Sequence, residues 1–367
     1  MNIAHIVYAK YWGGGEQDVY NFCKEENRLG FKNIVILDCK QTAMIEKFKN
    51  VAAVVPVPMA GLKRFTALRK YLNIIDKYNI EILNCHSGTI AYICAVLKML
   101  RPNIKLIMYR HNLKPGKRDI YHHWLNNKTD AFICVSKLVY NAQLKSAYPE
   151  HISKYHLIYN GIDTSSFEKR ANYYPQKPIK IGYAGRMVED KGIMTLLQAA
   201  DLLKNKYNFP CEIYLAGQGD KTFLKKCNDF IASKGLEDIF HYQKFLEDMS
   251  KFYKNIDIFV LPSIVREAFG LVLCEAMCSG VPVISTGSGA QAEIVDDNIN
   301  GFIVPPKDAD AIAKHIMALC SDRQKYQDFA AAGHLKVQKY FDIKLMVNKI
   351  NTLFEKLLAG NVHKTHN

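Results

Sequence analysis

Long apolar runs are missing from the sequence: no segment approaches the about 18 unbroken apolar residues that a membrane-spanning helix requires. The ten cysteines contain no C-x-x-C pair, and none shares zinc-ligand spacing with a histidine. These absences argue against a membrane span, a zinc module and a disulfide framework, and they suit a reducing cytoplasm. The first apolar run, residues 3–9, is short and lacks a cleavage site, so we interpret it as a strand rather than a signal peptide.

Short repeats and low-complexity tracts are also absent. The chain has 367 residues, of which 49% are hydrophobic and 23% charged, and this is enough for two packed cores of ordinary size. Residues 1–160 carry 23 basic and 11 acidic side chains, a net of +12, whereas residues 161–367 carry 26 and 24, a net of +2. The positive half would attract a polyanion, either nucleic acid or an anionic membrane surface, or it would serve solubility alone. No nucleic-acid recognition module is found, so we disfavour nucleic acid.

Near-continuous apolar runs alternate with amphipathic stretches in both halves, which is typical of parallel sheets covered by helices on both faces. We predict an α/β protein with two doubly wound, Rossmann-like domains, which bind ligands in a cleft at the carboxyl ends of their strands. The predicted parts are an N-terminal domain over 1–165, a polar, proline-marked linker over 166–178, a second domain over 179–342, and a C-terminal helix with tail over 343–367 that packs back toward the first domain. The expected strands are 3–9, 34–39, 53–57, 82–86, 106–110, 131–135 and 157–159, then 179–184, 212–216, 239–242, 256–261, 281–285 and 302–304.

Glycine-containing turns follow several of these strands. Gly13-Gly14-Gly15-Glu16 follows the first strand and opens a helix, where glycine lets a ligand approach the backbone and a helix N-terminus favours an anion. Ala216-Gly217-Gln218-Gly219-Asp220 repeats this arrangement in the second half. Neither contains the dinucleotide fingerprint G-x-G-x-x-G. Each turn is equally compatible with a plain connection between a strand and a helix.

Two cations stand at the start of the second half. Strand 179–184 runs into Gly185-Arg186, and Lys191-Gly192 follows after four residues, with a helix expected to begin at Lys191. Arginine grips phosphate with two hydrogen bonds and lysine adds a point charge, so the pair predicts a diphosphate site. The alternative is that both cations lie on the surface and pair with Glu189 and Asp190.

The segment 262–277 is the most specific. A loop carrying Glu267 follows a strand, and a helix is expected to begin near Phe269–Gly270. The first amides of that helix, those of Leu271 and Val272, would lack partners and suit a phosphate. Glu275 lies deeper in the same helix, where a carboxylate could meet ribose hydroxyls. In the alternative interpretation Glu267 caps the helix and Glu275 is an exposed helical residue.

This arrangement resembles the donor half of family 4 retaining glycosyltransferases, which have the GT-B fold. The resemblance is carried by Glu267, Phe269-Gly270-Leu271 and Glu275-Ala276-Met277, followed by Gly280-Val281-Pro282-Val283-Ile284 and Gly301-Phe302-Ile303-Val304. The turns described above agree with it, as does Asn160-Gly161-Ile162-Asp163. Together these matches cover nearly the whole chain in the order expected for the family.

The resemblance implies a role for each matching residue. Arg186 and Lys191 would neutralise the donor diphosphate in place of a metal, Glu275 would hold the ribose, and Glu267 would contact the transferred sugar. The amides of residues 271–272 would face a phosphate. The implied donor-binding set also contains Gly217, Phe269 and Gly270.

The first half would contribute to the same reaction. In the family, a histidine from the first domain lies near the sugar, and His111 in Tyr109-Arg110-His111-Asn112 matches that position. Gly14 and Gly15 would close over the donor. The family retains the anomeric configuration, and no carboxylate here is placed as a nucleophile, so front-face attack is expected. No cofactor and no metal are expected. A structural histidine at the end of a strand is the alternative for His111.

Basic residues of the first half mark a second candidate surface. Lys63, Arg64, Arg69 and Lys70 alternate with apolar residues along one helical stretch, which fits a helix at an anionic interface. Lys114, Lys117 and Arg118 follow His111 and suit a phosphate-bearing or lipid-linked glycan. We therefore expect peripheral association with the cytoplasmic face of a membrane and a cell-envelope acceptor. The alternative is a domain-surface helix with solvated charges.

Three functions remain open at this point. The first is transfer of a hexosyl or N-acetylhexosaminyl group from a nucleotide-diphosphate sugar, with uridine the commonest base in the family. The second is a nucleotide-sugar epimerase of similar two-domain shape, which needs no acceptor. The third is a non-catalytic protein that binds sugar nucleotides.

Overall fold

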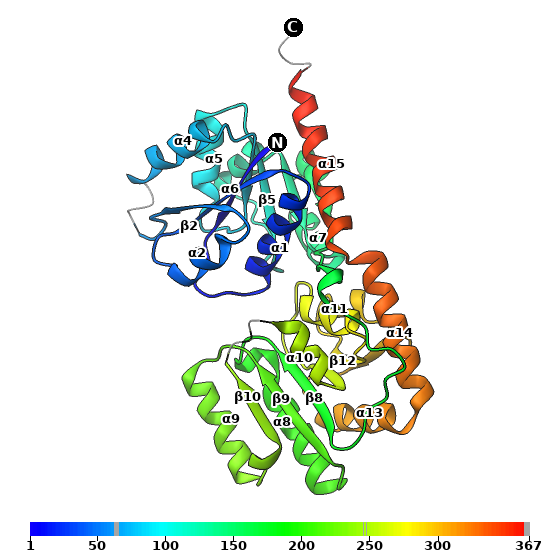
Figure 1. Cartoon of the computed structure of the whole chain (residues 1–367). Coiled ribbons are helices and arrows are strands. Elements are labelled where there is room, and N and C mark those ends of the chain that lie inside the picture. The colour runs from blue at the N-terminus through cyan, green and yellow to red at the C-terminus, as the bar shows by residue number, and fades with distance from the viewer. Residues whose placement is uncertain (62–65, 245, 247, 363–367) are drawn as a thin grey trace. The chain divides into compact units, whose positions relative to one another are not determined.

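Apolar runs of both halves form the strands of two parallel sheets. The computed structural model describes residues 1–61, 66–244, 246 and 248–362, with the side chains of 361 and 362 left undescribed. Two units emerge: unit 1 comprises Met1–Gly161 with Ile343–Asn367, and unit 2 comprises Ile162–Asp342. Each unit has one sheet with helices on both faces, so the predicted α/β class with two doubly wound sheets is confirmed (Figure 1).

The sheet of unit 1 reverses its strand order between β1 and β4. Its seven strands are arranged β3-β2-β1-β4-β5-β6-β7, and every pair is parallel. Ligands of doubly wound sheets bind at such a reversal, outside the carboxyl ends of the strands. The strands are β1 (Asn2–Val7), β2 (Lys32–Asp38), β3 (Ala53–Val57), β4 (Ile82–Cys85), β5 (Lys105–Arg110), β6 (Ala131–Cys134) and β7 (Tyr155–Leu157).

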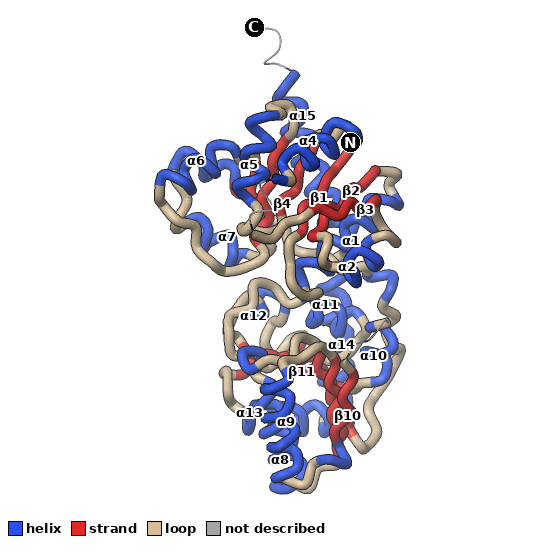
Figure 2. Tube along the Cα trace, turned by 90° about the vertical axis from the view of Figure 1, so that its left-hand side faces the viewer, coloured by secondary structure: helices blue, strands red, loops and turns tan. Residues whose placement is uncertain are grey.

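Helices cover both faces of this sheet (Figures 1 and 2). On one face α1, α2 and α15 bury apolar side chains, and α15 places Val347, Ile350 and Phe354 against Ile3 and Ile107. Helices α4, α5 and α6 pack side by side elsewhere on the unit. The helix that ends the described chain therefore belongs to the core of unit 1. The helices are α1 (Gly14–Arg28), α2 (Thr42–Phe48), α4 (Leu68–Lys77), α5 (Ala91–Leu100), α6 (Ile120–Lys128), α7 (Lys137–Leu144) and α15 (Ile343–Val362).

Unit 2 repeats the same design with six parallel strands. The order is β10-β9-β8-β11-β12-β13, so the reversal falls between β8 and β11. Helix α8 contacts α9 and α13, and α11 contacts α10 and α14. The strands are β8 (Ile179–Ala184), β9 (Cys211–Ala216), β10 (Phe240–Gln243), β11 (Ile258–Leu261), β12 (Val283–Thr286) and β13 (Gly301–Val304). The helices are α8 (Ile193–Asp201), α9 (Lys221–Ser233), α10 (Met249–Asn255), α11 (Leu271–Cys278), α12 (Gln291–Ile294), α13 (Ala309–Ser321) and α14 (Arg323–Tyr340).

Two boundaries differ from those expected. The units divide between residues 161 and 162 rather than after 165, and the stretch 166–178 belongs to unit 2 instead of linking two domains. Arg170 shows why, because its guanidinium donates to the carbonyl of Ile256 at 2.6 Å and ties the stretch to unit 2. The helix expected from Lys191 begins at Ile193, since Gly192 has a left-handed backbone with φ 70°.

Candidate functional site

The loops after β8 and β9 touch through their backbones. The amide of Gly185 donates to the carbonyl of Ala216 at 2.9 Å. Gly217 has φ 140°, and a Cβ atom at this position would lie 1.8 Å from the carbonyl oxygen of Gly185. Only glycine fits so close an approach. Backbone packing therefore accounts for Gly217, whose expected contact with the donor stays a prediction.

Lys191 and Glu267 form an ion pair beside these loops. Lys191 Nζ lies 2.6 Å from Glu267 Oε1, and each side chain is 16% exposed. The hydroxyl of Ser263, which the sequence analysis did not single out, donates to the same oxygen at 2.5 Å. The alternative in which Lys191 pairs with Glu189 or Asp190 is wrong, because Lys191 pairs with Glu267, and Glu189 pairs with Lys226 at 2.8 Å instead. The pair joins residues 76 positions apart across the reversal between β8 and β11.

The backbone at this pair is tightly constrained. A Cβ atom at Gly192 would lie 1.9 Å from the carbonyl oxygen of Pro262, and one at Gly289 would lie 2.3 Å from the amide nitrogen of Glu267. The carbonyl of Glu267 also accepts a hydrogen bond from the amide of Ala290 at 2.9 Å. Loops after β8, β11 and β12 thus hold Glu267 from three sides. The interpretation of Glu267 as a helix cap is wrong, since α11 begins without any side-chain cap.

Arg186 differs from Lys191 in being exposed. Its guanidinium forms no hydrogen bond or ion pair with the residues that the structure describes, so it is available to an anion. Its own carbonyl accepts from the hydroxyl of the buried Tyr183 at 2.9 Å, which anchors the backbone at this point. The surface pairing expected in the alternative is therefore not formed. One partly buried cation and one free cation follow the same strand.

Helix α11 presents its N-terminus at the same edge of the sheet. Gly270 precedes it with φ 137°, and the amides of Leu271 and Val272 occupy its first turn, where a helix offers no carbonyl partner. These amides and the positive end of the helix dipole suit a phosphate. Phe269 is buried, and its ring meets that of Phe341 at 5.5 Å, so it packs in the core of unit 2.

Glu275 is buried rather than exposed, which overturns the alternative interpretation of this residue. Only 8% of it is accessible, and Tyr253 of α10 donates its hydroxyl hydrogen to Oε2 at 2.9 Å. Burial raises the pKa of Glu275 to about 7, against a weaker lowering effect of the Tyr253 hydrogen bond. The carboxyl group is therefore balanced between its neutral and ionised forms at neutral pH.

In unit 1, Gly15 and His111 lie together at the carboxyl edge. Helix α1 begins at Gly14, which is exposed. A Cβ atom at Gly15 would be 3.7 Å from the His111 ring, an ordinary contact, so packing does not demand glycine there. The ring of Tyr109 stacks on that of His111 at 5.6 Å. Burial lowers the pKa of His111 to about 4, which makes the imidazole neutral at pH 7.

The expected interfacial helix has its apolar side turned inward. Lys63 and Arg64 lie outside the described residues, whereas Arg69 and Lys70 are exposed on α4. The apolar side of this helix is buried in unit 1, so it is not available for insertion into a membrane, and contact with an anionic interface through Arg69 and Lys70 stays a prediction. Charge alone remains on its outer side. The buried residues of α4 are Tyr71, Ile74 and Ile75.

The basic loop after His111 divides into two parts. Lys114 and Lys117 are exposed. Arg118 instead donates to the carbonyl of Ala147 at 2.9 Å, beyond the end of α7, where a cation is favoured by the helix dipole. Arg118 is exposed as well, so it has a structural contact, and the acceptor role expected of it stays a prediction. Ile120, the first residue of α6, is 91% exposed.

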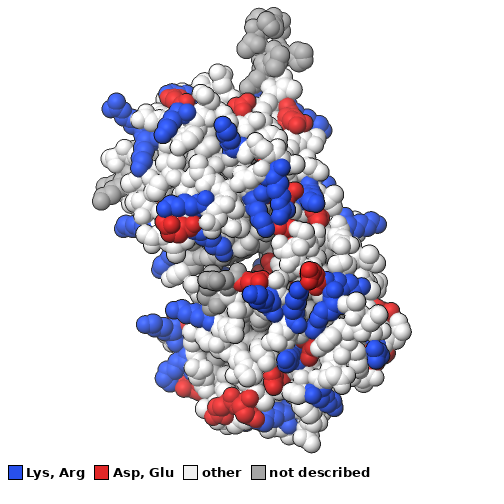
Figure 3. All heavy atoms as spheres, viewed as in Figure 1, with Lys and Arg blue, Asp and Glu red and all other residues white. Residues whose placement is uncertain are grey.

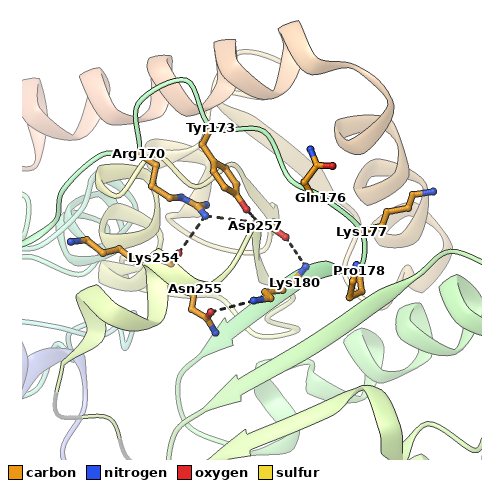
Figure 4. A pocket seen from close by; sticks show the side chains of 9 residues that line it. All are labelled: Arg170, Tyr173, Gln176, Lys177, Pro178, Lys180, Lys254, Asn255 and Asp257. Carbon is orange, nitrogen blue, oxygen red and sulfur yellow. Dashed lines mark hydrogen bonds and ion pairs between the residues drawn. The ribbon is translucent and has the colours of Figure 1, made fainter.

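A separate pocket of about 370 Å³ lies at the opposite edge of the unit 2 sheet (Figure 4). Lys180 stands at the start of β8 and Asp257 just before β11, so the pocket faces the amino ends of the strands. Asp257 accepts from the hydroxyl of Tyr173 at 2.5 Å and from the amide of Lys180 at 2.8 Å. These bonds fasten the stretch 166–178 to the sheet. The pocket is lined by Arg170, Tyr173, Gln176, Lys177, Pro178, Lys180, Lys254, Asn255 and Asp257.

The described residues offer neither a metal-binding cluster nor a helix able to span a membrane. No group of three or more His, Cys, Asp and Glu side chains within the described ranges is disposed to hold a metal ion. Across that same portion of the chain, no helix has both the length and the apolar character needed to cross a bilayer. In the view of Figure 3, basic side chains are scattered among acidic ones and do not gather in one patch.

Comparison with known proteins gives matches over most of the chain. A family model described as Glycosyltransferase Family 4 matches residues 12–166, and a model described as Glycosyl transferases group 1 matches residues 165–336. The first match falls on unit 1 and the second on unit 2.

Several known proteins and solved structures are similar to this chain over most of its length. A lipopolysaccharide 1,2-N-acetylglucosaminetransferase of Salmonella typhimurium is 28% identical over 74% of this chain and 73% of its own length. The crystal structure of a glycosyltransferase from Rickettsia africae superposes with a TM-score of 0.83 at 22% identity, over 97% of this chain and 98% of its own. HepE of Anabaena, crystallised with UDP and glucose, gives 0.81 at 19% identity over 97% and 100%. The matched models, the two doubly wound sheets and these relatives show that the chain belongs to the family 4 type of GT-B glycosyltransferases.

Proposed function

We propose that this protein is a retaining, metal-independent glycosyltransferase. It moves a hexosyl or N-acetylhexosaminyl group from a nucleotide-diphosphate sugar, with UDP the favoured nucleotide, to a cell-envelope glycan or lipid-linked acceptor. The observation that carries the donor site is the Lys191–Glu267 ion pair at the reversal between β8 and β11, beside the free guanidinium of Arg186. The UDP in HepE and the lipopolysaccharide transferase of Salmonella support the nucleotide and the class of acceptor.

The donor diphosphate is proposed to bind where positive charge meets free amides. Breaking the bond between sugar and phosphate leaves negative charge on the diphosphate, and groups fixed in advance stabilise it as it develops. Lys191 and Arg186 supply full charges, and the amides of residues 271–272 supply oriented dipoles. These groups support departure of the nucleotide without a metal ion.

Glu267 and Glu275 are proposed to have different tasks. Glu267 accepts from both Lys191 and Ser263, so its charge is already engaged at one oxygen, and the second oxygen remains to orient a sugar hydroxyl. Glu275 is buried against Tyr253 and suits the ribose hydroxyls. Both carboxylates are already engaged in hydrogen bonds, so formation of a covalent bond between either carboxylate and the sugar is disfavoured. This supports front-face attack with retention of the anomeric configuration.

His111 is proposed to meet the reacting sugar from unit 1. A neutral imidazole can accept a hydrogen bond from a hydroxyl group, and the low pKa of His111 keeps the ring neutral over the physiological range. Gly15 leaves the adjacent ring face uncovered by a side chain. Gly14 and Gly15 are proposed to lie close to the bound donor.

The acceptor surface is proposed to include Lys114 and Lys117, which are exposed beyond His111. The neighbouring Ile120 and Tyr121 are 91% and 44% exposed, so charge and apolar surface occur together there. Such a surface suits a lipid-linked, phosphate-bearing glycan and peripheral contact with the cytoplasmic face of a membrane. Flotation with anionic and neutral vesicles at low salt tests this part, and failure to float with anionic vesicles overturns it.

One experiment tests the transferase itself. The protein is screened against nucleotide sugars for thermal stabilisation, since a ligand present at about 100 times its Kd adds about 2.7 kcal/mol. The stabilising donor is then incubated with and without glycan acceptors. We expect acceptor-dependent release of nucleotide that falls about 100-fold in Glu267→Gln, with donor binding retained. Conversion of the donor without acceptor would identify an epimerase, and binding without turnover would identify a non-catalytic binding protein.

A further inference from the structure

Three histidines of unit 1 form a hydrogen-bonded chain that ends at His111. His111 follows β5, and its Nε2 lies 3.0 Å from Nδ1 of His86, which follows β4. His86 Nε2 lies 3.0 Å from Nδ1 of His5 on β1. His5 Nε2 lies 3.3 Å from Oδ1 of Asn33 on β2. The chain crosses the adjacent strands β2, β1, β4 and β5.

The register of the sheet creates this chain. Asn33 is aligned with Ile3. His5 is aligned with Asn84, which in turn is aligned with Ile107. Each of the three histidines therefore lies two residues nearer the carboxyl edge than the preceding member of the row, which begins at Asn33. Side chains alternate between the two faces of a strand, so a stagger of two residues keeps all four on one face.

The three imidazoles are neutral at pH 7. Burial lowers the pKa values of His5 and His111 to about 4, although the hydrogen bond with Asn33 acts in the opposite direction on His5. Burial and then the two neighbouring histidines lower the pKa of His86 well below its usual value. The rings also stack, with centroids 5.2 Å apart for His5 and His86 and 5.3 Å apart for His86 and His111. A neutral imidazole has one N–H donor and one bare nitrogen, so each ring relays the direction of its neighbour's hydrogen bond.

We propose that His5 and His86 are positioning residues that fix the tautomer of His111, so that its Nδ1 presents a bare acceptor to a substrate hydroxyl. The amide of Asn33 is placed with Oδ1 toward His5, and this oxygen can only accept, so in this placement His5 carries its hydrogen on Nε2. His5 Nδ1 then accepts from His86, and His86 Nδ1 accepts from His111. Nδ1 of His111 is left bare: it is buried and has no hydrogen-bond partner among the described residues, so a hydroxyl that enters the site would satisfy it.

This inference rests on the proposed role of His111 in glycosyl transfer and defines what His111 offers there. A bare Nδ1 selects a hydroxyl that donates its hydrogen, and the oxygen of that hydroxyl keeps its lone pairs for its other contacts. The opposite tautomer would place an N–H at the same point and select an acceptor. A histidine held in the wrong tautomer loses turnover even where its position is kept. Asn33, which lies three strands away from His111, sets the direction of every hydrogen bond in this row of side chains.

The test reads the tautomer directly, without substrate. The protein is labelled with ¹⁵N in histidine, and two-bond ¹H–¹⁵N correlation spectra show which ring nitrogen carries hydrogen; His111→Gln assigns the signals. We expect His111 protonated at Nε2 in the wild type and in Asn33→Asp, which retains an acceptor. In His86→Phe, which keeps an aromatic ring of similar shape, and in Asn33→Leu, we expect a mixture of tautomers. Circular dichroism verifies folding, and His86→Phe alone decides the matter if Asn33→Leu does not fold.

Kinetics provide the second readout. With the donor identified, kcat should fall about tenfold in His86→Phe while the donor KM stays within twofold, and Asn33→Asp should retain turnover. Protonation of His111 at Nδ1 in the wild type, or an unchanged tautomer in both chain-breaking variants, would overturn the inference. A protein that shows the expected tautomers yet transfers no sugar would refute the proposed function and leave the hydrogen-bonded chain established.

Discussion

The two sheets share a strand order, but their functional edges are built from different chemistry. In unit 2, Lys191 and Glu267 form an ion pair, and the exposed Arg186 follows the same strand as Lys191. In unit 1, His111 ends a row of neutral imidazoles, and its pKa is low because the ring is removed from water. Strand order therefore decides where a site forms, whereas the residues of the loops decide whether it suits a charged diphosphate or an uncharged hydroxyl.

The largest effect is expected when the partly buried cation of unit 2, Lys191, is removed. Lys191→Met should lower kcat/KM for transfer by about 10²–10³-fold, because a fixed charge facing the leaving group is lost and Glu267 is left without its partner. The control is Lys226→Met, whose lysine pairs with Glu189 at an exposed position of the same unit. We expect that variant to retain full activity. Equal losses in the two variants would mean that the charge of unit 2 has no local role.

The next largest difference between the units should appear when glycine is replaced by alanine, because the backbone around these glycines is packed differently. Gly192→Ala should lower the free energy of unfolding by more than about 2 kcal/mol, because a methyl group would clash with the carbonyl of Pro262 at a left-handed residue. Gly235→Ala, with φ 61° and open space around it, should cost only about 1 kcal/mol. In unit 1, Gly15→Ala should cost nothing or stabilise α1 by up to about 1 kcal/mol. Chemical denaturation measures all three, and a Gly192→Ala variant as stable as Gly235→Ala contradicts the close approach.

The pH dependence of donor binding should come from unit 2 alone. In the proposed site ribose hydroxyls would donate to ionised Glu275, whose pKa is raised to about 7, so the ionised fraction and with it the affinity should rise about tenfold between pH 6 and 8. His111, with a pKa of about 4, stays neutral throughout this range. Calorimetric titration with UDP-glucose at a series of pH values measures the effect, and Glu275→Gln should bind with little pH dependence. A pH profile that survives in Glu275→Gln would show that another group titrates.

The smallest effect should be at the exposed lysines of unit 1. Reversing both Lys114 and Lys117 to glutamate should weaken binding to anionic vesicles about fivefold at low salt, and added salt should reduce the difference. The matched control reverses Lys221 and Lys225, which are exposed on α9 of unit 2. Sedimentation with vesicles compares the two variants. Equal weakening in both would indicate a diffuse charge effect over the whole chain.

Local patterns predicted some elements closely and others poorly. The strand expected over 179–184 is β8 with the same bounds, because a buried parallel strand has a continuous apolar run. The amphipathic period of residues 63–78 predicts a helix, and α4 occupies residues 68–77 of that stretch. The same period does not indicate whether the apolar side faces a membrane or the protein core. In the structure it faces the core. The helix expected at Lys191 begins two residues later, because Gly192 has a left-handed backbone that packs against the carbonyl of Pro262.

The candidate sites show the same division. Lys191 and Glu267 were both recognised from local motifs, but their pairing was not, since the two residues meet only when β8 and β11 become neighbours. Burial of Glu275 depends on Tyr253 from another helix. His111 was expected from its place after a strand. His5 and His86 gave no separate signal, because only the register of the sheet places them in one row.

The sequence by itself determined the class of the fold and the positions of the functional loops, because alternation of apolar runs and placement of glycine are local properties of the chain. The tertiary structure decided the partners of Lys191 and Glu275, the inward side of α4 and the chain from Asn33 to His111. Ion pairs, pKa values and tautomers depend on distance and on exclusion of water, and both are set by strands that lie far apart in the sequence and side by side in the sheet.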